Sequence, residues 1–336
     1  ANWELHKAQT QLTRAGAEGG IPIVFFHGRG GSVSRGGAPT GHAIAAQPAG
    51  SVQGRMRITE QGEVVSSKYA NEGTAQYQME LLTASVFEHT LKSDHEQELK
   101  PEPEFDAVME ELSILAFKHY RELVETEGLV DYYNAASPVE ELTMMNIGSR
   151  PARRFGARTL QDLRAIPWVF AWTQNRTLVP GWYGMGTAIA AFLQSHGERG
   201  KERLRELFDR SRLFRLIIDE VEKTLTLVDL EVARGYAELV TDSRLRDLIF
   251  SRIEDEFHLT ARKVQDITGN GKLAVRFRRF SRKLHRRHDI LHQAGLAQVK
   301  LVRRYRQKTA GRKQLDDLIP LLLSINCVSS GLGWTG

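Results

Sequence analysis

The amino-acid sequence predicts a mainly α-helical protein whose first part is of the α/β type. In that part, three short apolar runs, typical of strands buried in a parallel sheet, stand between longer segments with helical periodicity. From about Gly186 to the end, every pattern that we recognise is helical. We therefore predict an α/β region over residues 1–185 and an all-helical region over residues 186–336.

The first predicted elements are a helix and a strand. Residues 1–18 carry apolar side chains close to helical spacing, and the pair Gly19-Gly20 ends this helix. The apolar run Ile21–Phe26 predicts a strand buried on both faces, and it leads into a glycine-rich loop over residues 27–39. Helical patterns follow over residues 70–91 and 105–126.

Two further apolar runs predict two more buried strands. The run Leu142–Ile147 ends shortly before Arg150, and the run Ile166–Trp172 begins shortly after Arg164. Trp168 and Trp172, four residues apart in the second run, are predicted to belong to the core. Beyond these runs, the sequence breaks its helical pattern at residues 269–271.

Composition excludes several classes of protein. The chain has 336 residues, 41% hydrophobic and 26% charged, which is enough to bury a core in one large domain or two ordinary ones. Its single cysteine, Cys327, excludes a disulfide framework within the chain, and we predict that it is a small core residue. The longest apolar stretches, such as Leu318–Ile325, are less than half a membrane span, so no transmembrane helix is expected.

The net charge of +5 comes from one basic segment. Residues 272–313 hold 15 Lys and Arg against a single acid, Asp289, a local charge of +14 that leaves −9 for the rest of the chain. Basic residues interleaved with aromatic ones are also typical of nucleic-acid binding. We favour a solvated helix face and expect no nucleic-acid partner, because one apolar stripe is formed by Leu273, Phe277, Phe280 and Leu284. A metal site at His285, His288 and His292 is disfavoured by the surrounding arginines.

The predicted strand ends deliver one imidazole and several cations. His27 and Arg29 follow the first strand, Arg150 follows the second, and Arg164 lies beside the third. In parallel α/β folds, ligands bind at the carboxyl ends of strands. Arginine matches phosphate and carboxylate oxygens two at a time, so these residues predict a small ligand with several negative charges.

The glycine-rich loop fits the same ligand. Gly28, Gly30 and Gly31 let backbone N–H groups approach an anion closely, and Arg35 lies in the part of the loop that can close over it. The spacing is neither that of a Walker A loop nor that of a dinucleotide-binding fingerprint. The alternatives are an ordinary surface loop and a structural, hydrogen-bonded His27.

Four blocks of sequence resemble one enzyme family. They are residues 26–39, the pair of short motifs at 46–48 and 61–63, residues 146–151, and residues 163–176. In this order they are similar to phosphoenolpyruvate carboxylase. The resemblance covers the chain from end to end, but it corresponds only to the C-terminal part of that enzyme.

The resemblance implies a fold, a reaction and a set of site residues. The family is a cytoplasmic, Mg- or Mn-dependent lyase, usually a homotetramer, with a large helical region around a (β/α)8 TIM-type barrel. It joins phosphoenolpyruvate and bicarbonate to give oxaloacetate and phosphate, through carboxyphosphate and a metal-bound enolate. The resemblance implies that His27 is the catalytic histidine of the glycine-rich loop, that Arg29, Arg150 and Arg164 hold the substrate, and that Arg35 belongs to the mobile part of the loop.

Two departures from the family accompany this resemblance. The metal-binding carboxylates and a second essential histidine are expected upstream of Ala1, so we expect the isolated chain to hold part of the active site and to be inactive. Residues that bind acidic inhibitors also differ: Leu227 stands at a lysine position, with Lys223 one turn earlier, and Trp334 replaces an asparagine. The resemblance places the effector arginine at Arg287, with Leu296-Ala-Gln298 setting the register. We therefore expect weak or absent inhibition by aspartate or malate. The alternative function is that of a catalytically silent relative that acts as a binding or scaffold module.

Overall fold

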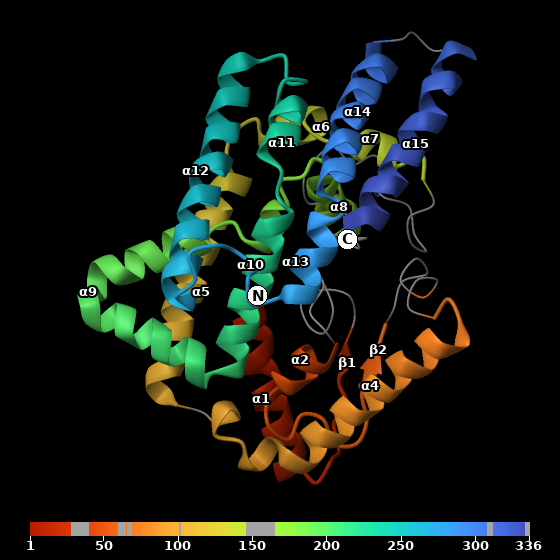
Figure 1. Ribbon diagram of the computed structural model, residues 1–336. Helices are drawn as coiled ribbons and strands as arrows, with labels where there is room; N and C mark the ends of the chain where they lie inside the picture. The colour runs from red at the N-terminus through yellow and green to blue at the C-terminus, as the bar shows by residue number, and fades with distance from the viewer. Residues whose placement is uncertain are drawn as a thin grey trace. The chain divides into compact units, whose positions relative to one another are not determined.

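The computed structural model describes most of the chain and divides it into two compact units. The described residues are 1–27, 40–59, 65, 69–100, 102–145, 165–307 and 312–332. Unit 1 comprises Ala1–Ala116 and Ala188–Val221, and unit 2 comprises Phe117–Thr187 and Glu222–Gly336. Helices dominate both units (Figure 1). The mainly α-helical prediction is therefore confirmed for the described residues, whereas the β/α barrel stays a prediction.

Unit 1 contains the one sheet among the described residues, with helices packed against it. Its elements in chain order are α1 (Asn2–Glu18), β1 (Phe26–His27), α2 (Thr40–Ala45), β2 (Arg57–Ile58), α4 (Glu72–Lys92), the 3-10 turns η1 (Ser93–His95) and η2 (Gln97–Leu99), and the first part of α5 (Pro103–Val124). Parts of α9 (Met185–Arg210) and α10 (Arg212–Leu227) complete it. The predicted helices over residues 1–18, 70–91 and 105–126 are thus confirmed.

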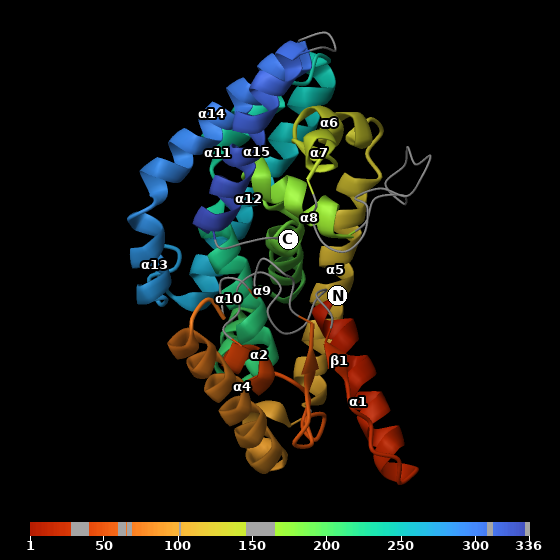
Figure 2. The same ribbon diagram turned by 90° about the vertical axis from the view of Figure 1, so that its right-hand side faces the viewer.

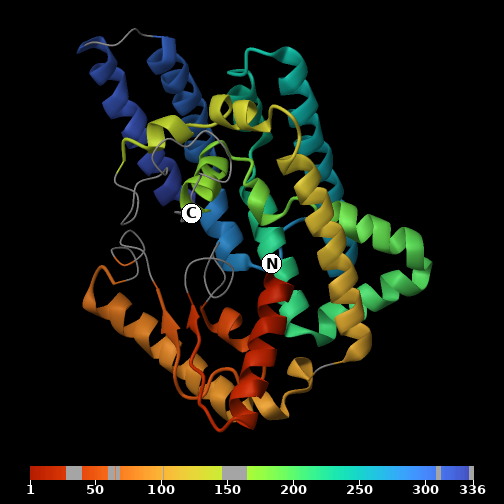
Figure 3. The same cartoon turned by 180° about the vertical axis from the view of Figure 1, so that it is seen from behind.

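Unit 2 is built from helices alone in its described part. They are the rest of α5, α9 and α10 with α6 (Leu129–Ala135), α7 (Val139–Leu142), α8 (Ala165–Gln174), η4 (Val179–Gly181), α11 (Leu230–Ala237), α12 (Ser243–Thr268), α13 (Arg278–His285), α14 (His288–Gln307) and α15 (Arg312–Leu332). α14 and α15 pack along each other (Figure 2). The C-terminal part of α5, in gold, runs beside α12, in teal (Figure 3). No described helix is long and apolar enough to cross a membrane.

The predicted strand over Ile166–Trp172 is wrong, because these residues lie in helix α8. Trp172 is fully buried, as predicted, together with Phe170 and Ala171, whereas Trp168 is only half-buried. A helix that is apolar all round shows no amphipathic periodicity, so its sequence resembles that of a doubly buried strand. Pro167 in the first turn is compatible with a helix start, because proline lacks an N–H that would be unpaired there.

The other two predicted strands are corrected as well. β1 covers only Phe26–His27, and Ile21, Val24 and Phe26 are exposed rather than buried on both faces. A two-residue partner strand gives the earlier residues nothing to pair with. In the run Leu142–Ile147, Leu142 ends helix α7, and the residues from 146 onward lie outside the described ranges.

Two predictions about single faces are also wrong. Helix α13 begins at Arg278, so Leu273 and Phe277 lie before it and share no helical stripe with Phe280 and Leu284. The turn region after Gly269 extends further than the pattern suggested. Cys327 is exposed, because on α15 the buried positions include Ile325 and Val328, and residue 327 points away from that face.

Candidate functional site

The structure describes one of the predicted site residues, His27. Its position is therefore the anchor of the candidate site. The other predicted site residues lie outside the described ranges: Gly28, Arg29, Gly30, Gly31, Arg35, Arg150 and Arg164.

His27 lies at the carboxyl end of a parallel strand, as the sequence predicts. β1 pairs in parallel with β2, with Phe26 opposite Arg57 and His27 opposite Ile58 (Figure 1). The Thr59 amide continues the ladder by donating to the His27 carbonyl oxygen at 2.9 Å. Alternation along the strand leaves Phe26 61% exposed and His27 only 5% exposed. The strand therefore directs the imidazole inward at the residue where the glycine-rich loop begins.

The local packing of unit 1 holds this strand end in place. Ile58, the register partner of His27, is partly buried and packs against a core cluster formed by Ala43 and Ile44 of α2. Before the strand, the Ile21 amide donates to the Gly16 carbonyl oxygen at 2.8 Å, where α1 ends. A Cβ at Gly16 would lie 2.7 Å from the Ile21 carbonyl oxygen, so this close approach requires glycine. Thus the partner strand β2 packs against the core of unit 1, and the chain leading to β1 is tied to the end of α1.

Burial sets the protonation state of His27. Desolvation disfavours the imidazolium and lowers the pKa of His27 below its ordinary value. At neutral pH the ring is therefore mainly uncharged. A neutral imidazole has one nitrogen that donates a hydrogen bond and one that accepts a proton, so His27 is equipped to act as a general base at the strand end.

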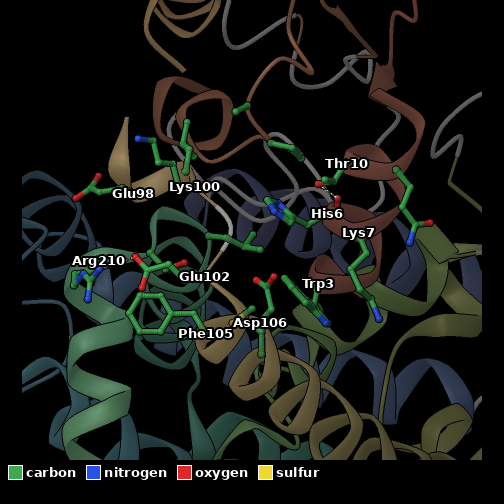
Figure 4. Close-up of a pocket in the computed structure, with 17 residues that line it drawn as sticks. Trp3, His6, Lys7, Thr10, Glu98, Lys100, Glu102, Phe105, Asp106 and Arg210 are labelled. Atoms are coloured by element: carbon green, nitrogen blue, oxygen red, sulfur yellow. Dashed lines mark hydrogen bonds and ion pairs between the residues drawn. The ribbon is translucent and has the colours of Figure 1, made fainter. Parts of the chain in front are cut away.

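A cavity in unit 1 does not include His27 (Figure 4). Trp3 and His6 of α1 form one wall with their rings stacked 5.8 Å apart, and burial lowers the pKa of His6 to about 4. Three cations line it, Lys7, Lys100 and Arg210, together with three acids, Glu98, Glu102 and Asp106. Two of the cations are paired: Lys7 Nζ lies 2.6 Å from Glu110 Oε2, and Arg210 Nη2 lies 2.6 Å from Glu102 Oε1. A ligand with several negative charges needs cations that are not neutralised, so this cavity does not match the predicted anion site.

A buried polar network in unit 2 surrounds Leu227, the altered effector position. The Arg176 guanidinium, 2% exposed, donates to the Leu227 carbonyl oxygen from Nη2 at 3.0 Å and Nε at 3.2 Å. It also donates to the Leu291 carbonyl oxygen at 3.5 Å and lies 4.0 Å from Asp229 Oδ2. His292 Nδ1 lies 2.9 Å from the same Asp229 oxygen. We call these five residues the Arg176 network.

Asp229 stays charged in this network. Burial raises the pKa of Asp229, but the hydrogen bonds from His292 and the Val232 amide, with the Arg176 charge, outweigh it and hold the pKa below its ordinary value. The side chain also caps α11, where the Val232 amide donates to Oδ1 at 3.1 Å. The network therefore ties the end of α10, the start of α11 and α14 together through a buried ion pair.

The predicted effector residues are neighbours of this network. Leu227 is 2% exposed and apolar, while Lys223 Nζ lies 4.6 Å from the Phe277 ring centroid. Arg287 Nη1 donates to the Gly331 carbonyl oxygen at 3.3 Å, near the end of α15. A Cβ at Gly331 would lie 2.3 Å from Leu291 Cδ2, so Leu291 joins Arg287 and α15 to the Arg176 network. Trp334 lies outside the described residues.

Sequence reasoning missed the roles of Arg176 and His292. Arg176 follows the apolar run Ile166–Trp172 after three polar residues, and its partner Leu227 lies 51 residues away in sequence. The spacing of His285, His288 and His292 suggests only a metal site and gives no sign of the contact between His292 and Asp229. Within the described ranges, no group of three or more His, Cys, Asp or Glu side chains is arranged to hold a metal ion. The described residues thus do not fit the family's Mg or Mn, and we derive no step through it.

Comparison with known proteins gives a match over the whole chain. The family model described as phosphoenolpyruvate carboxylase matches residues 1–336. A phosphoenolpyruvate carboxylase of Methylorubrum extorquens is 56% identical over 336 residues, which is all of this chain and 36% of that protein. Those of Bradyrhizobium diazoefficiens and Synechococcus are each 41% identical, with 36% and 33% of their lengths covered. The chain therefore spans about a third of the length of these curated relatives.

Proposed function

The chain belongs to the phosphoenolpyruvate carboxylase family, and we propose that it works as the C-terminal part of such a lyase. The reaction joins phosphoenolpyruvate and bicarbonate to give oxaloacetate and phosphate. The observation that carries the proposal is the family match over all 336 residues, with one relative at 56% identity. In this proposal residues 1–185 belong to a β/α barrel, the protein is a cytoplasmic homotetramer, and its Mg or Mn ligands lie outside this chain.

His27 supplies the general base of the proposed site. Its buried, neutral imidazole at the carboxyl end of β1 supports this role, because a base must be unprotonated before it accepts a proton. We propose that it assists the steps at carboxyphosphate and CO2, which follow attack of bicarbonate on the phosphoryl group. Arg29, Arg150 and Arg164 hold the phosphate and carboxylate groups of the substrate. Gly28, Gly30 and Gly31 let the backbone of the glycine-rich loop approach these anionic groups, and Arg35 acts from the same loop.

A joined protein tests the proposed function. It consists of the part of the Methylorubrum extorquens relative that precedes the matched region, followed by this chain. We expect the joined protein to form oxaloacetate from phosphoenolpyruvate and bicarbonate, measured by coupled reduction of oxaloacetate, and we expect the chain alone to be inactive. A folded joined protein with no turnover would favour the silent scaffold instead, and turnover by the chain alone would contradict a partial active site.

The Leu227 neighbourhood supports a second property, weak inhibition by aspartate or malate. An acidic inhibitor needs cationic donors, and here the side chain of Leu227 is apolar and buried while Lys223 packs over Phe277. We expect Leu227→Lys in the joined protein to lower the inhibitor concentration for half-inhibition about tenfold, which corresponds to about 1.4 kcal/mol. Strong inhibition of the joined protein without this substitution would contradict the proposal.

A further inference from the structure

His119 in unit 2 lies between two carboxylates. On α5, its Nδ1 is 3.2 Å from Glu122 Oε2, and its Nε2 is 3.5 Å from Glu256 Oε2 on α12. The ring stacks on Tyr183 with centroids 5.2 Å apart and an interplanar angle of 4°. The His119 side chain is 27% exposed, so it is held by neighbours while remaining accessible to protons from solvent.

Glu256 is a fixed, buried acceptor. It is 3% exposed, and its Oε1 accepts from the amides of Gly184 and Thr187, each at 3.1 Å. Its Oε2, which faces His119, also accepts from Thr187 Oγ1 at 2.5 Å. Burial raises the pKa of Glu256, but the hydrogen bonds from His119 and Thr187 outweigh it and lower the pKa below its ordinary value. The carboxylate is therefore charged at neutral pH and anchors the start of α9.

The surrounding charges favour the imidazolium. An open hollow is lined by His119 and Glu122 of α5, by Tyr183 and Thr187 at the start of α9, and by Arg252, Asp255 and Glu256 of α12. Three carboxylates thus face one guanidinium, and Arg252 Nη1 is engaged in donating to Thr126 Oγ1 at 2.9 Å. The hydrogen bond to Glu256 raises the pKa of His119 above its ordinary value, and this effect outweighs desolvation, which lowers the pKa.

We propose that His119 is a pH-sensitive clamp that fastens the C-terminal part of α5 to α12 and to the start of α9. The protonated ring bridges Glu122 and Glu256, and the bridge is lost when the ring loses its proton. Tyr120, the residue after His119, contacts α8, because Trp168 Nε1 donates to Tyr120 Oη at 3.1 Å.

The sign of the pH dependence follows from the direction of the shift. A histidine whose folded-state pKa is raised stabilises the fold below its unfolded pKa, and that contribution is lost as the pH rises through the folded-state pKa. Since Glu256 must also be charged, the clamp is strongest in mildly acidic to neutral solution. It weakens on the alkaline side.

Thermal unfolding of the 336-residue chain tests the clamp at pH 6 and pH 9. Tryptophan fluorescence reports mainly unit 2, which contains Trp168, Trp172, Trp182 and Trp334. We expect His119→Gln to lower the transition temperature by about 2–4 °C at pH 6 and by less than about 1 °C at pH 9. The matched control is His288→Gln, also in unit 2: His288 Nδ1 lies 3.3 Å from Asp289 Oδ1, but both side chains are 59% or more exposed. This control shifts the transition by less than about 1 °C at both pH values.

Titration of His119 by NMR tests the same proposal without unfolding the protein. With histidines labelled at Cε1, the His119 signal is assigned as the one absent from His119→Gln. We expect Glu256→Gln to lower the titration midpoint of His119. Glu122→Gln should lower the midpoint less, because the Glu122 side chain is exposed. The proposal is overturned if His119→Gln costs the same stability at both pH values, or if neither glutamine variant moves the midpoint.

Discussion

Two buried regions of this chain, the strand end at His27 and the Arg176 network, favour opposite charge states of a titratable side chain. At the strand end in unit 1, burial lowers the pKa of His27 and keeps the ring neutral. In the Arg176 network in unit 2, burial raises the pKa of Asp229, yet donors from His292 and Val232 and the charge of Arg176 reverse the shift. Desolvation acts on both groups, and at Asp229 the hydrogen-bond donors and the nearby positive charge outweigh it. The neutral His27 can accept a proton as a general base, whereas the charged Asp229 stabilises the packing of the helices that it joins.

Removing the charge partner is the largest expected disturbance of the network. Arg176→Leu removes the hydrogen-bond donors to the Leu227 and Leu291 carbonyl oxygens. It also removes the positive charge that stabilises the buried Asp229 carboxylate. We expect a loss of about 3 kcal/mol in the free energy of unfolding, measured by urea denaturation with tryptophan fluorescence. The control Arg303→Leu removes a guanidinium 3.7 Å from Glu238, with both side chains 46% or more exposed, and costs at most about 1 kcal/mol. Equal losses in the two variants would contradict the buried-network account.

The packing that positions the strand end at His27 is tested by adding a methyl group at Gly16 instead of removing a charge. Gly16→Ala places a Cβ against the Ile21 carbonyl oxygen, a backbone atom that moves only with the chain leading to β1. We expect a local loss of about 1–3 kcal/mol, seen as faster hydrogen exchange over residues 21–27. Gly73→Ala is the control, since the nearest atom to its added Cβ is Asn71 Oδ1 at 3.7 Å. Unchanged exchange over residues 21–27 in Gly16→Ala would show that this contact does not hold His27.

The smallest expected effect is the acid response of Asp229. Its folded-state pKa lies below the ordinary value, so it stabilises the fold above the unfolded pKa and the contribution disappears as the pH falls through the folded-state pKa. We expect Asp229→Asn to cost on the order of 1 kcal/mol at pH 6 and progressively less toward pH 3. Urea denaturation across this range measures the difference. A cost independent of pH would mean that only the cap of α11 is lost.

Local signals in the sequence predicted much of the fold. The glycine pair after residue 18 marks the end of α1, and the break at residues 269–271 marks the end of α12. The sequence of helix α8 predicts a strand because both sides of the helix are apolar, which removes the periodicity that separates the two structures. Cys327 shows the converse: apolar neighbours in sequence face the core, while the cysteine between them does not.

The candidate site was predictable only where it follows from a strand end. His27 lies where the apolar run indicated, although the strand itself is short. The Arg176 network was not predictable, because its members are joined over 51 and 115 positions and follow no repeating pattern. The roles of Arg29, Arg35, Arg150 and Arg164 rest on the family resemblance and stay predictions.

The most direct test of the account compares the joined protein with its His27→Asn variant. The measurement is incorporation of ¹³C-bicarbonate into oxaloacetate, made at equal amounts of folded protein and with phosphoenolpyruvate present. If His27 is the neutral base of the site, the variant loses activity by about 10²–10⁴-fold while its unfolding transition stays close to that of the joined protein. A variant that retains full incorporation would contradict the account.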